Sequence, residues 1–185
     1  MKRILLILLF LPMIGFGQTK NYSSNDFSFI YPSSFDEKKL NLSHVLPTVK
    51  LVSKSQTHFD IVIIKKLSNT IPNNVTTSDV EEINNVELEK HILMLKENLG
   101  VESFGSFFST TKEQIFNKIV FISIGKYEAA DINLFTWKAN YHFNVKNESF
   151  LIQYDSERID GRENDSFDVF KNRLKEIFII IESIK

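Results

Sequence analysis

The most regular pattern in the chain is an alternation of apolar and polar residues between positions 135 and 145. Every second residue from Phe135 to Val145 is apolar, and the residues between them are polar or charged. Successive side chains of a β-strand point to opposite faces of a sheet. The pattern therefore predicts an antiparallel strand over 133–145 with one face on the core. The other face, with Lys138, Asn140 and His142, is expected in water.

Similar but shorter patterns predict six more strands. Aromatic residues alternate with Ser28 and Ile30 in the first, and Pro32 ends it. Residues 59–64 form a nearly continuous apolar run, which indicates an inner strand covered on both faces. We expect residues 18–25 to lack regular structure and residues 33–47 to form a loop. The predicted strands lie at 27–32, 49–52, 59–64, 102–109, 115–127 and 149–155, and a short turn at 146–148 joins the last one in a hairpin.

Two segments repeat their apolar residues at helical spacing. The first begins at Ser78, where Ser78 to Glu81 resembles a capping box, and ends before Gly100; a break is plausible at Asn84–Asn85. The second follows an N-cap at Asn164, Asp165 or Ser166. Their apolar stripes consist of Leu88, Ile92, Leu95 and Leu99, and of Phe167, Phe170, Leu174, Ile177, Ile181 and Ile184.

These elements follow one another as three strands, a helix, four strands and a helix. Such an order predicts the α+β class, with one mainly antiparallel sheet and helices packed on it. Neither a repeat nor a linker interrupts residues 18–185, whose length is typical of one domain.

The first 17 residues have the organisation of a secretory signal peptide. Lys2 and Arg3 precede an apolar run from Ile4 to Phe16, and Gly15 and Gly17 provide the small residues of a cleavage site. The run is shorter than the roughly 20 residues that span a bilayer. We therefore expect cleavage before Gln18 and a periplasmic or secreted mature protein. The alternatives are an uncleaved anchor and a buried strand.

Composition and charge exclude several classes of partner and chemistry. Net charge is −1, and basic residues form no cluster along the chain, which argues against nucleic acid or an anionic membrane as partner. The chain has no cysteine, which excludes disulfides, thiolate metal sites and lipid attachment through cysteine. Most of the 17 phenylalanines fall on predicted core positions, although a Phe-lined ligand cavity would use the same residues.

Catalytic and metal-binding motifs are weak. Gly105-Ser106 lacks the second glycine of a nucleophile elbow and falls within a predicted strand. The two His–acid pairs with suitable spacing are His58 with Asp60 and His91 with Glu87. Each pair would supply only two of the four ligands of a tetrahedral metal site. We therefore predict no catalytic residues, no metal and no cofactor.

The polar segment 155–165 is the best candidate for contact with a partner. If Gly161 is aligned with the invariant glycine of a calcium loop, Arg158 occupies a ligand position, which is unsuitable for a cation. Arginine is enriched at interface hot spots, and Arg158 and Arg162 flank an apolar Ile159. We predict that Arg158, Ile159 and Arg162 bind a partner; the alternative is a solvated connector.

The order of elements also resembles a known family. The segment Phe27 to Pro32 is similar to the opening strand of PsbP-like proteins, and the resemblance continues through the hairpin 137–154 to the closing Ile181-Glu182-Ser183-Ile184. That family contains the extrinsic photosystem II protein, a eukaryotic Ran-binding nuclear-import factor and many exported bacterial relatives. The resemblance implies an α-β-α sandwich that acts as a non-enzymatic binding or accessory module. No functional residue of the family matches a position here.

Taken together, these patterns predict an exported, non-catalytic accessory module that binds another envelope or secreted protein. One alternative is a carrier of a small hydrophobic ligand in a Phe-lined pocket. A second alternative is a hydrolase whose site the motifs do not reveal.

Overall fold

The structure is a computed structural model and describes residues 18–38, 47–54, 59–132, 134–158 and 164–185. Strands make up most of its elements. In these ranges no helix is long and apolar enough to cross a membrane. The elements are β1 (Thr19–Ser23), β2 (Ser28–Pro32), β3 (Asp36–Lys38), β4 (Thr48–Lys54), β5 (Phe59–Lys66), α1 (Thr77–Leu99), β6 (Phe104–Ile115), β7 (Lys118–Ala129), the short helix η1 (Ala130–Ile132), β8 (Leu134–Val145), β9 (Glu148–Arg158) and α2 (Asn164–Ser183).

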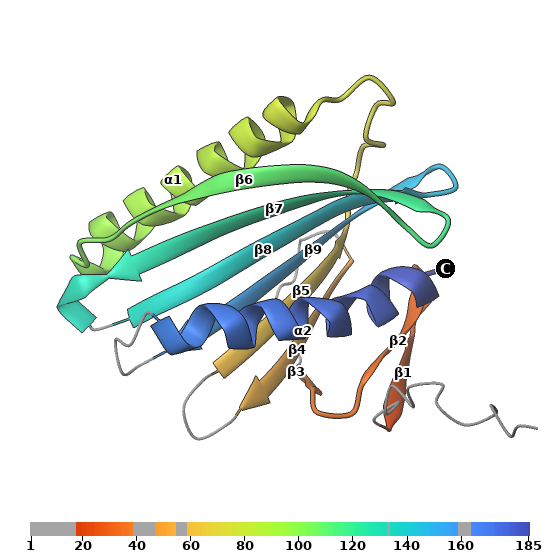
Figure 1. Ribbon diagram of the computed structural model, residues 1–185, viewed down its shortest axis with the longest axis horizontal. Coiled ribbons are helices and arrows are strands. Elements are labelled where there is room, and N and C mark those ends of the chain that lie inside the picture. The colour runs from red at the N-terminus through yellow and green to blue at the C-terminus, as the bar shows by residue number, and fades with distance from the viewer. Residues whose placement is uncertain (1–17, 39–46, 55–58, 133, 159–163) are drawn as a thin grey trace, which may run out of the picture.

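A seven-stranded sheet in the order β3-β4-β5-β9-β8-β7-β6 forms the middle of the molecule (Figure 1). All neighbouring strands are antiparallel. The long hairpins β6–β7 and β8–β9 turn at the same end of the sheet, where Phe116 and Lys146 take left-handed φ values of 54° and 57°. β5 lies between β4 and β9, as predicted, but it is not covered on both faces, because Ile61, Ile63 and Lys65 remain partly exposed.

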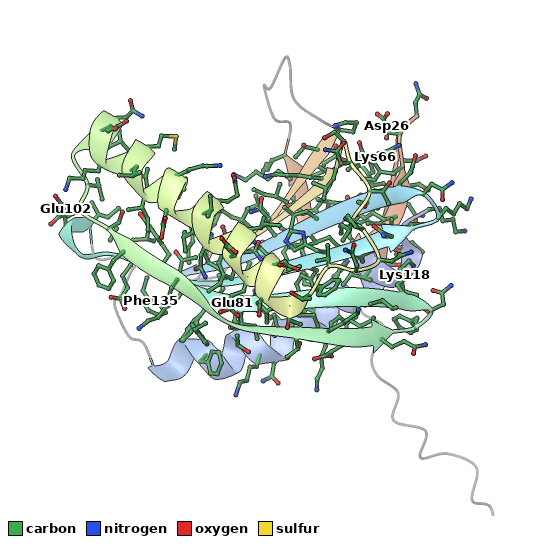
Figure 2. All side chains as sticks on the ribbon, turned by 90° about the horizontal axis from the view of Figure 1, so that it is seen from above. Asp26, Lys66, Glu81, Glu102, Lys118 and Phe135 are labelled. Carbon is green, nitrogen blue, oxygen red and sulfur yellow. The ribbon has the colours of Figure 1, made fainter. Side chains whose placement is uncertain are left out.

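The two helices cover opposite faces of this sheet, as the two views in Figures 1 and 2 show. On one face, Trp137 lies against Phe167 of α2 with ring centroids 4.5 Å apart, and Tyr154 stacks on Phe170 at 5.3 Å. The two-stranded sheet of β1 and β2 lies beside α2 on the same face. The main core cluster therefore includes Phe27, Phe29, Tyr31, Trp137, Tyr141, Phe143, Phe150, Tyr154, Phe170, Ile177 and Ile181.

The opposite face of β8 is not exposed to solvent, although its polar residues predict that it is. Helix α1 covers Asn140 and His142, and both side chains are buried. Asn84 of α1 supplies their partner: its Oδ1 accepts from Asn140 Nδ2 at 2.6 Å and contacts His142 Nε2 at 3.1 Å. Its Nδ2 donates to Ser123 at 2.8 Å. These hydrogen bonds allow polar residues to be buried, and a strand pattern alone does not reveal them.

The start of α1 differs from the sequence prediction in detail. Its N-cap is Thr76, which forms a capping box with Asp79, and not Ser78. The helix also continues without a break through Asn84–Asn85: Val80, Asn84 and Leu88 are buried at i, i+4 and i+8, and both amides bond to the sheet. Gly100 takes a φ of 67° at the C-cap, as predicted from its place after Leu99.

Two segments expected to lack regular structure contain short strands. β1 pairs with β2 from Thr19↔Pro32 to Ser23↔Ser28, and Ser24 closes the turn by accepting from the amide of Asp26 at 3.2 Å. β3 pairs with β4. The strands β1 and β3 present mostly exposed polar side chains, so the hydropathy pattern that marks buried strands is absent from them.

Candidate functional site

The predicted partner-binding residues lie at the edge of what the structure describes. β9 ends at Arg158, whose backbone pairs with Phe135, while Ile159 and Arg162 lie outside the described residues. Their contact with a partner therefore stays a prediction.

Beside α1, a groove runs over the part of the sheet that the helix leaves open. The helix lies against β6 and β7, so the same face of β5 and β9 remains partly exposed next to it. Two adjoining hollows, which share His91, Lys138 and Asp155, make up this helix groove. Figure 2 looks onto α1 and the strands beside it.

The polar hollow of the helix groove has a volume of about 280 Å³. Asn140 lines it and is 4% exposed. The Oδ1 atom of Asn140 is buried and accepts no hydrogen bond from the described residues, because Nδ2 is the atom that faces Asn84. Other lining residues are Ile63, Lys65, Glu87, Leu88, Phe107 and Gln153.

The apolar hollow has a volume of about 200 Å³ and lies toward the C-terminal end of α1. Leu99 and Ile132 form part of its wall, and they are 68% and 55% exposed. Large apolar side chains that remain exposed beside a cavity are typical of binding surfaces. The remaining apolar lining consists of Leu95, Val101, Tyr127 and Leu134.

An ion pair lies where the two hollows meet. Lys138 Nζ and Asp155 Oδ1 are 2.7 Å apart, and their side chains are only 14% and 18% exposed. On the helix side, the His91 ring lies 6.0 Å from the ring of Tyr127. Burial and the nearby Lys138 charge lower the pKa of His91, so its imidazole is neutral at pH 7.

Two further charged groups in the helix groove have shifted pKa values. Burial lowers the pKa of Lys65, and the charges of Glu87 and Asp155 partly offset this shift. Burial and the charge of Asp155 raise the pKa of Glu157. Charged groups with shifted pKa values in a hollow are candidate functional groups.

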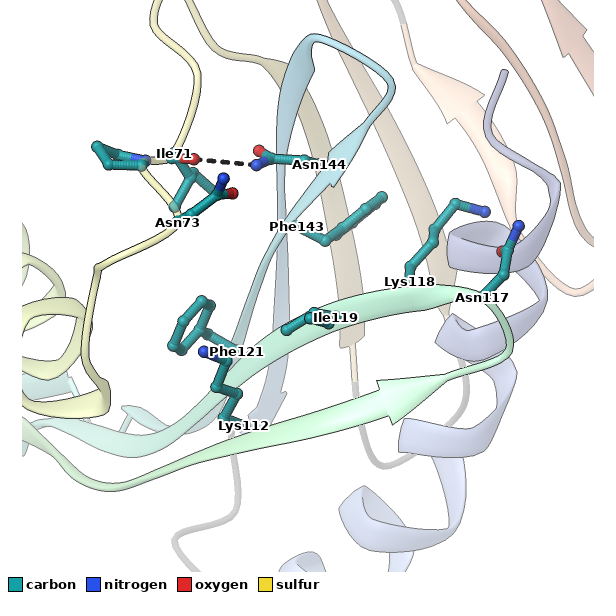
Figure 3. Close-up of a pocket in the computed structure, with 10 residues that line it drawn as sticks. Ile71, Asn73, Lys112, Asn117, Lys118, Ile119, Phe121, Phe143 and Asn144 are labelled. Atoms are coloured by element: carbon teal, nitrogen blue, oxygen red, sulfur yellow. Dashed lines mark hydrogen bonds between the residues drawn. The ribbon is translucent and has the colours of Figure 1, made fainter.

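A separate hollow, drawn in Figure 3, lies at the hairpin end of the sheet and measures about 260 Å³. Phe121 and Phe143 are its only phenylalanines among the described residues. Asn144, on its wall, already donates to the carbonyl of Ile71 at 3.0 Å and accepts from Ser149. Its volume is below the roughly 300–1,000 Å³ of typical ligand pockets, so it does not favour the carrier alternative.

The acids considered as metal ligands have other partners. Asp60 is fully buried, accepts from the Tyr154 hydroxyl at 2.9 Å and forms an ion pair with Arg173. His58 lies outside the described residues. Glu87 pairs with Lys90 at 2.7 Å and not with His91. The described part of the chain contains no group of three His, Asp or Glu residues that could hold a metal.

Comparison with known proteins yields structural matches alone. No family model and no curated protein matches the chain. The solution structure of cyanobacterial PsbP from Synechocystis sp. PCC 6803 matches with a TM-score of 0.51 at 13% identity, covering 93% of this chain and 94% of that one. A mutant of the protein Mog1 matches with a TM-score of 0.51 at 9% identity, covering 91% and 95%. The chain has the PsbP-like fold. The α+β class and the α-β-α sandwich predicted from the sequence are thus confirmed.

Within this PsbP-like fold, sequence reasoning did not find the helix groove, although one signal was present. If the turn at 146–147 fixes the register of the hairpin, Val145 pairs with Glu148 and Lys138 falls opposite Asp155. Two opposite charges on directly paired positions indicate an ion pair. Asn140 gave no such signal, because only the position of α1 buries it.

Proposed function

We propose that this protein is an exported, non-catalytic module that binds another envelope or secreted protein through the helix groove. The observation that carries the proposal is that the apolar hollow at Leu99 adjoins a polar hollow, and that the two share His91, Lys138 and Asp155. Interfaces combine apolar anchors with polar groups in this way. Export is supported by the signal-peptide pattern of residues 1–17.

A binding role fits the charges of the helix groove better than catalysis does. Lys138 and Asp155 pair with each other, and Glu87 pairs with Lys90. A general acid or base must reach the substrate with its proton position open. The structural similarity to PsbP and Mog1 is consistent with an accessory role, although it is a similarity of fold.

Site-specific photocrosslinking tests the proposal. A benzophenone amino acid replaces Leu99 in one variant and Leu93 in another. Both residues are on α1 and exposed, at 68% and 57%, but only Leu99 lines the helix groove. In cells of the native host, we expect the Leu99 probe to yield a discrete protein adduct that the Leu93 probe does not.

The captured protein is then identified and purified, and its affinity for wild-type protein and for Leu99→Lys is measured by calorimetry. We expect the substitution to abolish measurable binding, whereas Leu93→Lys retains it. Equal adducts at both positions, or equal affinities of the two variants, would show that the helix groove is not the partner site.

A further inference from the structure

Helix α1 has a second apolar surface, on the side that faces away from the sheet (Figure 2). The inner side of the helix is fixed to the sheet by the buried residues Val80, Asn84 and Leu88. On the outer side, large apolar side chains remain between 42% and 57% exposed. They are Ile83, Val86, Leu93 and Met94, here called the outer stripe. Exposed apolar patches of this kind are typical of interaction sites.

The spacing of the outer stripe is that of a contact between two helices. Positions on this side of α1 recur at alternating intervals of three and four residues, at Ile83, Val86, Lys90, Leu93 and Glu97. This is the repeat of the a and d positions through which one helix packs along another, and a polar residue at one such position fixes the register of the pair. The spacing therefore favours a helical occupant over a strand, whose side chains repeat every second residue.

Uncompensated negative charge surrounds the outer stripe. The two lysines of α1 are already paired, Lys90 with Glu87 at 2.7 Å and Lys96 with Glu102 at 2.8 Å. The lysines of the helix groove lie on the other flank of α1. The remaining acids on the outer side form no ion pair with any residue that the structure describes, and they are Asp79, Glu82, Glu89 and Glu97. An occupant of the outer stripe therefore meets an excess of carboxylates.

This charge decides between three kinds of occupant. A second copy of the chain would bring two acidic surfaces together, and like charges across an interface are unfavourable. An anionic lipid surface attracts basic segments and would repel these carboxylates. A helix with lysine or arginine beside its apolar residues is complementary to the outer stripe in both shape and charge, because charges that flank the a and d positions select the partner.

We infer that the outer stripe binds an amphipathic helix of a partner protein, one whose apolar residues are flanked by lysine or arginine. The apolar side chains of that helix pack between Ile83 and Leu93, and its basic side chains pair with Glu82 and Glu89. This surface is separate from the helix groove, so the inference goes beyond the proposed function and does not rest on it.

Two synthetic helical peptides test the inference on the purified protein. Both repeat leucine at the a and d positions, and their flanking positions carry lysine in one peptide and glutamate in the other. Fluorescence anisotropy of the labelled peptides measures binding. We expect only the lysine peptide to bind, with an affinity that decreases as salt is raised. Leu93→Lys should weaken this binding by about tenfold or more. The double substitution Glu82→Lys, Glu89→Lys should transfer the preference to the glutamate peptide.

Control variants separate the outer stripe from non-specific binding. Leu99→Lys changes the helix groove, and Lys175→Glu changes an exposed charge on α2, across the sheet. Both should bind the lysine peptide as wild type does. Circular dichroism of each variant checks that it is folded, since the substituted residues are exposed.

Photocrosslinking in the native host identifies the natural partner. A benzophenone amino acid at Ile83 should yield a protein adduct that Leu93→Lys in the same chain removes. This adduct should differ in mass from the one formed at Leu99, so the outer stripe and the helix groove are scored separately.

Equal binding of the two peptides, or binding of the lysine peptide that Leu93→Lys leaves intact, would overturn the inference. A dimer in analytical ultracentrifugation that Leu93→Lys dissociates would assign the outer stripe to a second copy instead. Co-sedimentation with phosphatidylglycerol vesicles that the same variant loses would assign it to a membrane. None of these outcomes changes the expected Leu99 adduct, so the proposed function stands or fails independently.

Discussion

The side-chain amide of Asn85 bonds to both backbone groups of Phe107. Asn85 Oδ1 accepts from the Phe107 N–H at 2.7 Å, and Asn85 Nδ2 donates to the Phe107 carbonyl at 3.2 Å. Phe107 lies on β6, the edge strand of the sheet, next to a β-bulge between Phe107 and Ser109. Open edges of this kind pair readily with other chains. At the bulge, the Asn85 side chain thus makes the two backbone hydrogen bonds that a neighbouring strand would otherwise make.

We predict that Asn85→Ala lowers the free energy of unfolding by about 1–2 kcal/mol, because it removes two hydrogen bonds to partly buried backbone groups. The open edge should also increase self-association. Urea denaturation and light scattering measure the two effects. The matched control is Asn98→Ala on the same helix, since the Asn98 amide bonds only to the exposed Met94 carbonyl, at 2.9 Å. Identical midpoints for the two variants would contradict the role of Asn85.

The contrast between Asn85 and Trp137 illustrates which parts of the fold the sequence reveals. The Trp137 side of β8 was predicted correctly, since regular burial on one face leaves a period of two in the sequence. The sequence predicts a break at Asn84–Asn85 because Val80 and Ile83 fall on a different helix face from the apolar stripe that begins at Leu88. The actual role of both asparagines depends on Ser123 and Phe107, which are distant in sequence and adjacent only after folding.

The helix groove was harder to predict than the sheet for the same reason. Its residues come from α1 and from the strands β5 to β9, and no local motif joins Lys65 to Asn140. Only the pairing of Lys138 with Asp155 follows from hairpin register. The segment with Arg158, Ile159 and Arg162 is the reverse case: its residue composition predicts contact with a partner, and that contact stays a prediction.

Lys138 and Trp137 are adjacent in sequence and should respond differently to truncation. Trp137→Ala removes a buried ring that packs on Phe167 and should cost about 3–5 kcal/mol. Lys138→Ala should cost about 1–2 kcal/mol, because it leaves Asp155 partly buried without its partner. Thermal and urea unfolding measure both. A silent Lys138→Ala would show that the ion pair adds nothing to stability.

Asp60 should be intolerant of neutralisation. It is fully buried between the Tyr154 hydroxyl and the Arg173 guanidinium. Asp60→Asn keeps an acceptor for Tyr154 but removes the buried carboxylate charge that pairs with Arg173, which should cost about 3 kcal/mol. The control is Asp36→Asn, which breaks the exposed 2.9 Å pair with Lys20 and should leave the urea midpoint unchanged. Equal midpoints for the two variants would show that the buried pair contributes no more than the surface pair.

His142 should make the fold sensitive to mild acid. Burial lowers its pKa from 6.5 to about 4, and its Nε2 lies 3.1 Å from Asn84 Oδ1. Between pH 6.5 and 4 the unfolded chain binds a proton that the folded protein excludes, so stability is complete above this window and decreases as the pH falls through it. At 1.36 kcal/mol per pKa unit, the loss attributable to His142 is at most about 3 kcal/mol.

The measurement is urea denaturation at several pH values from 7.5 to about 4 for wild type and for His142→Gln, whose amide can still donate to Asn84 but does not titrate. Other carboxylates contribute to the acid dependence of both proteins, so the difference between the two curves isolates His142. We expect wild type to lose stability relative to His142→Gln as the pH falls below 6.5. Parallel curves over the whole range would mean that His142 takes up its proton equally well in the folded protein, and hence that α1 does not exclude water from it.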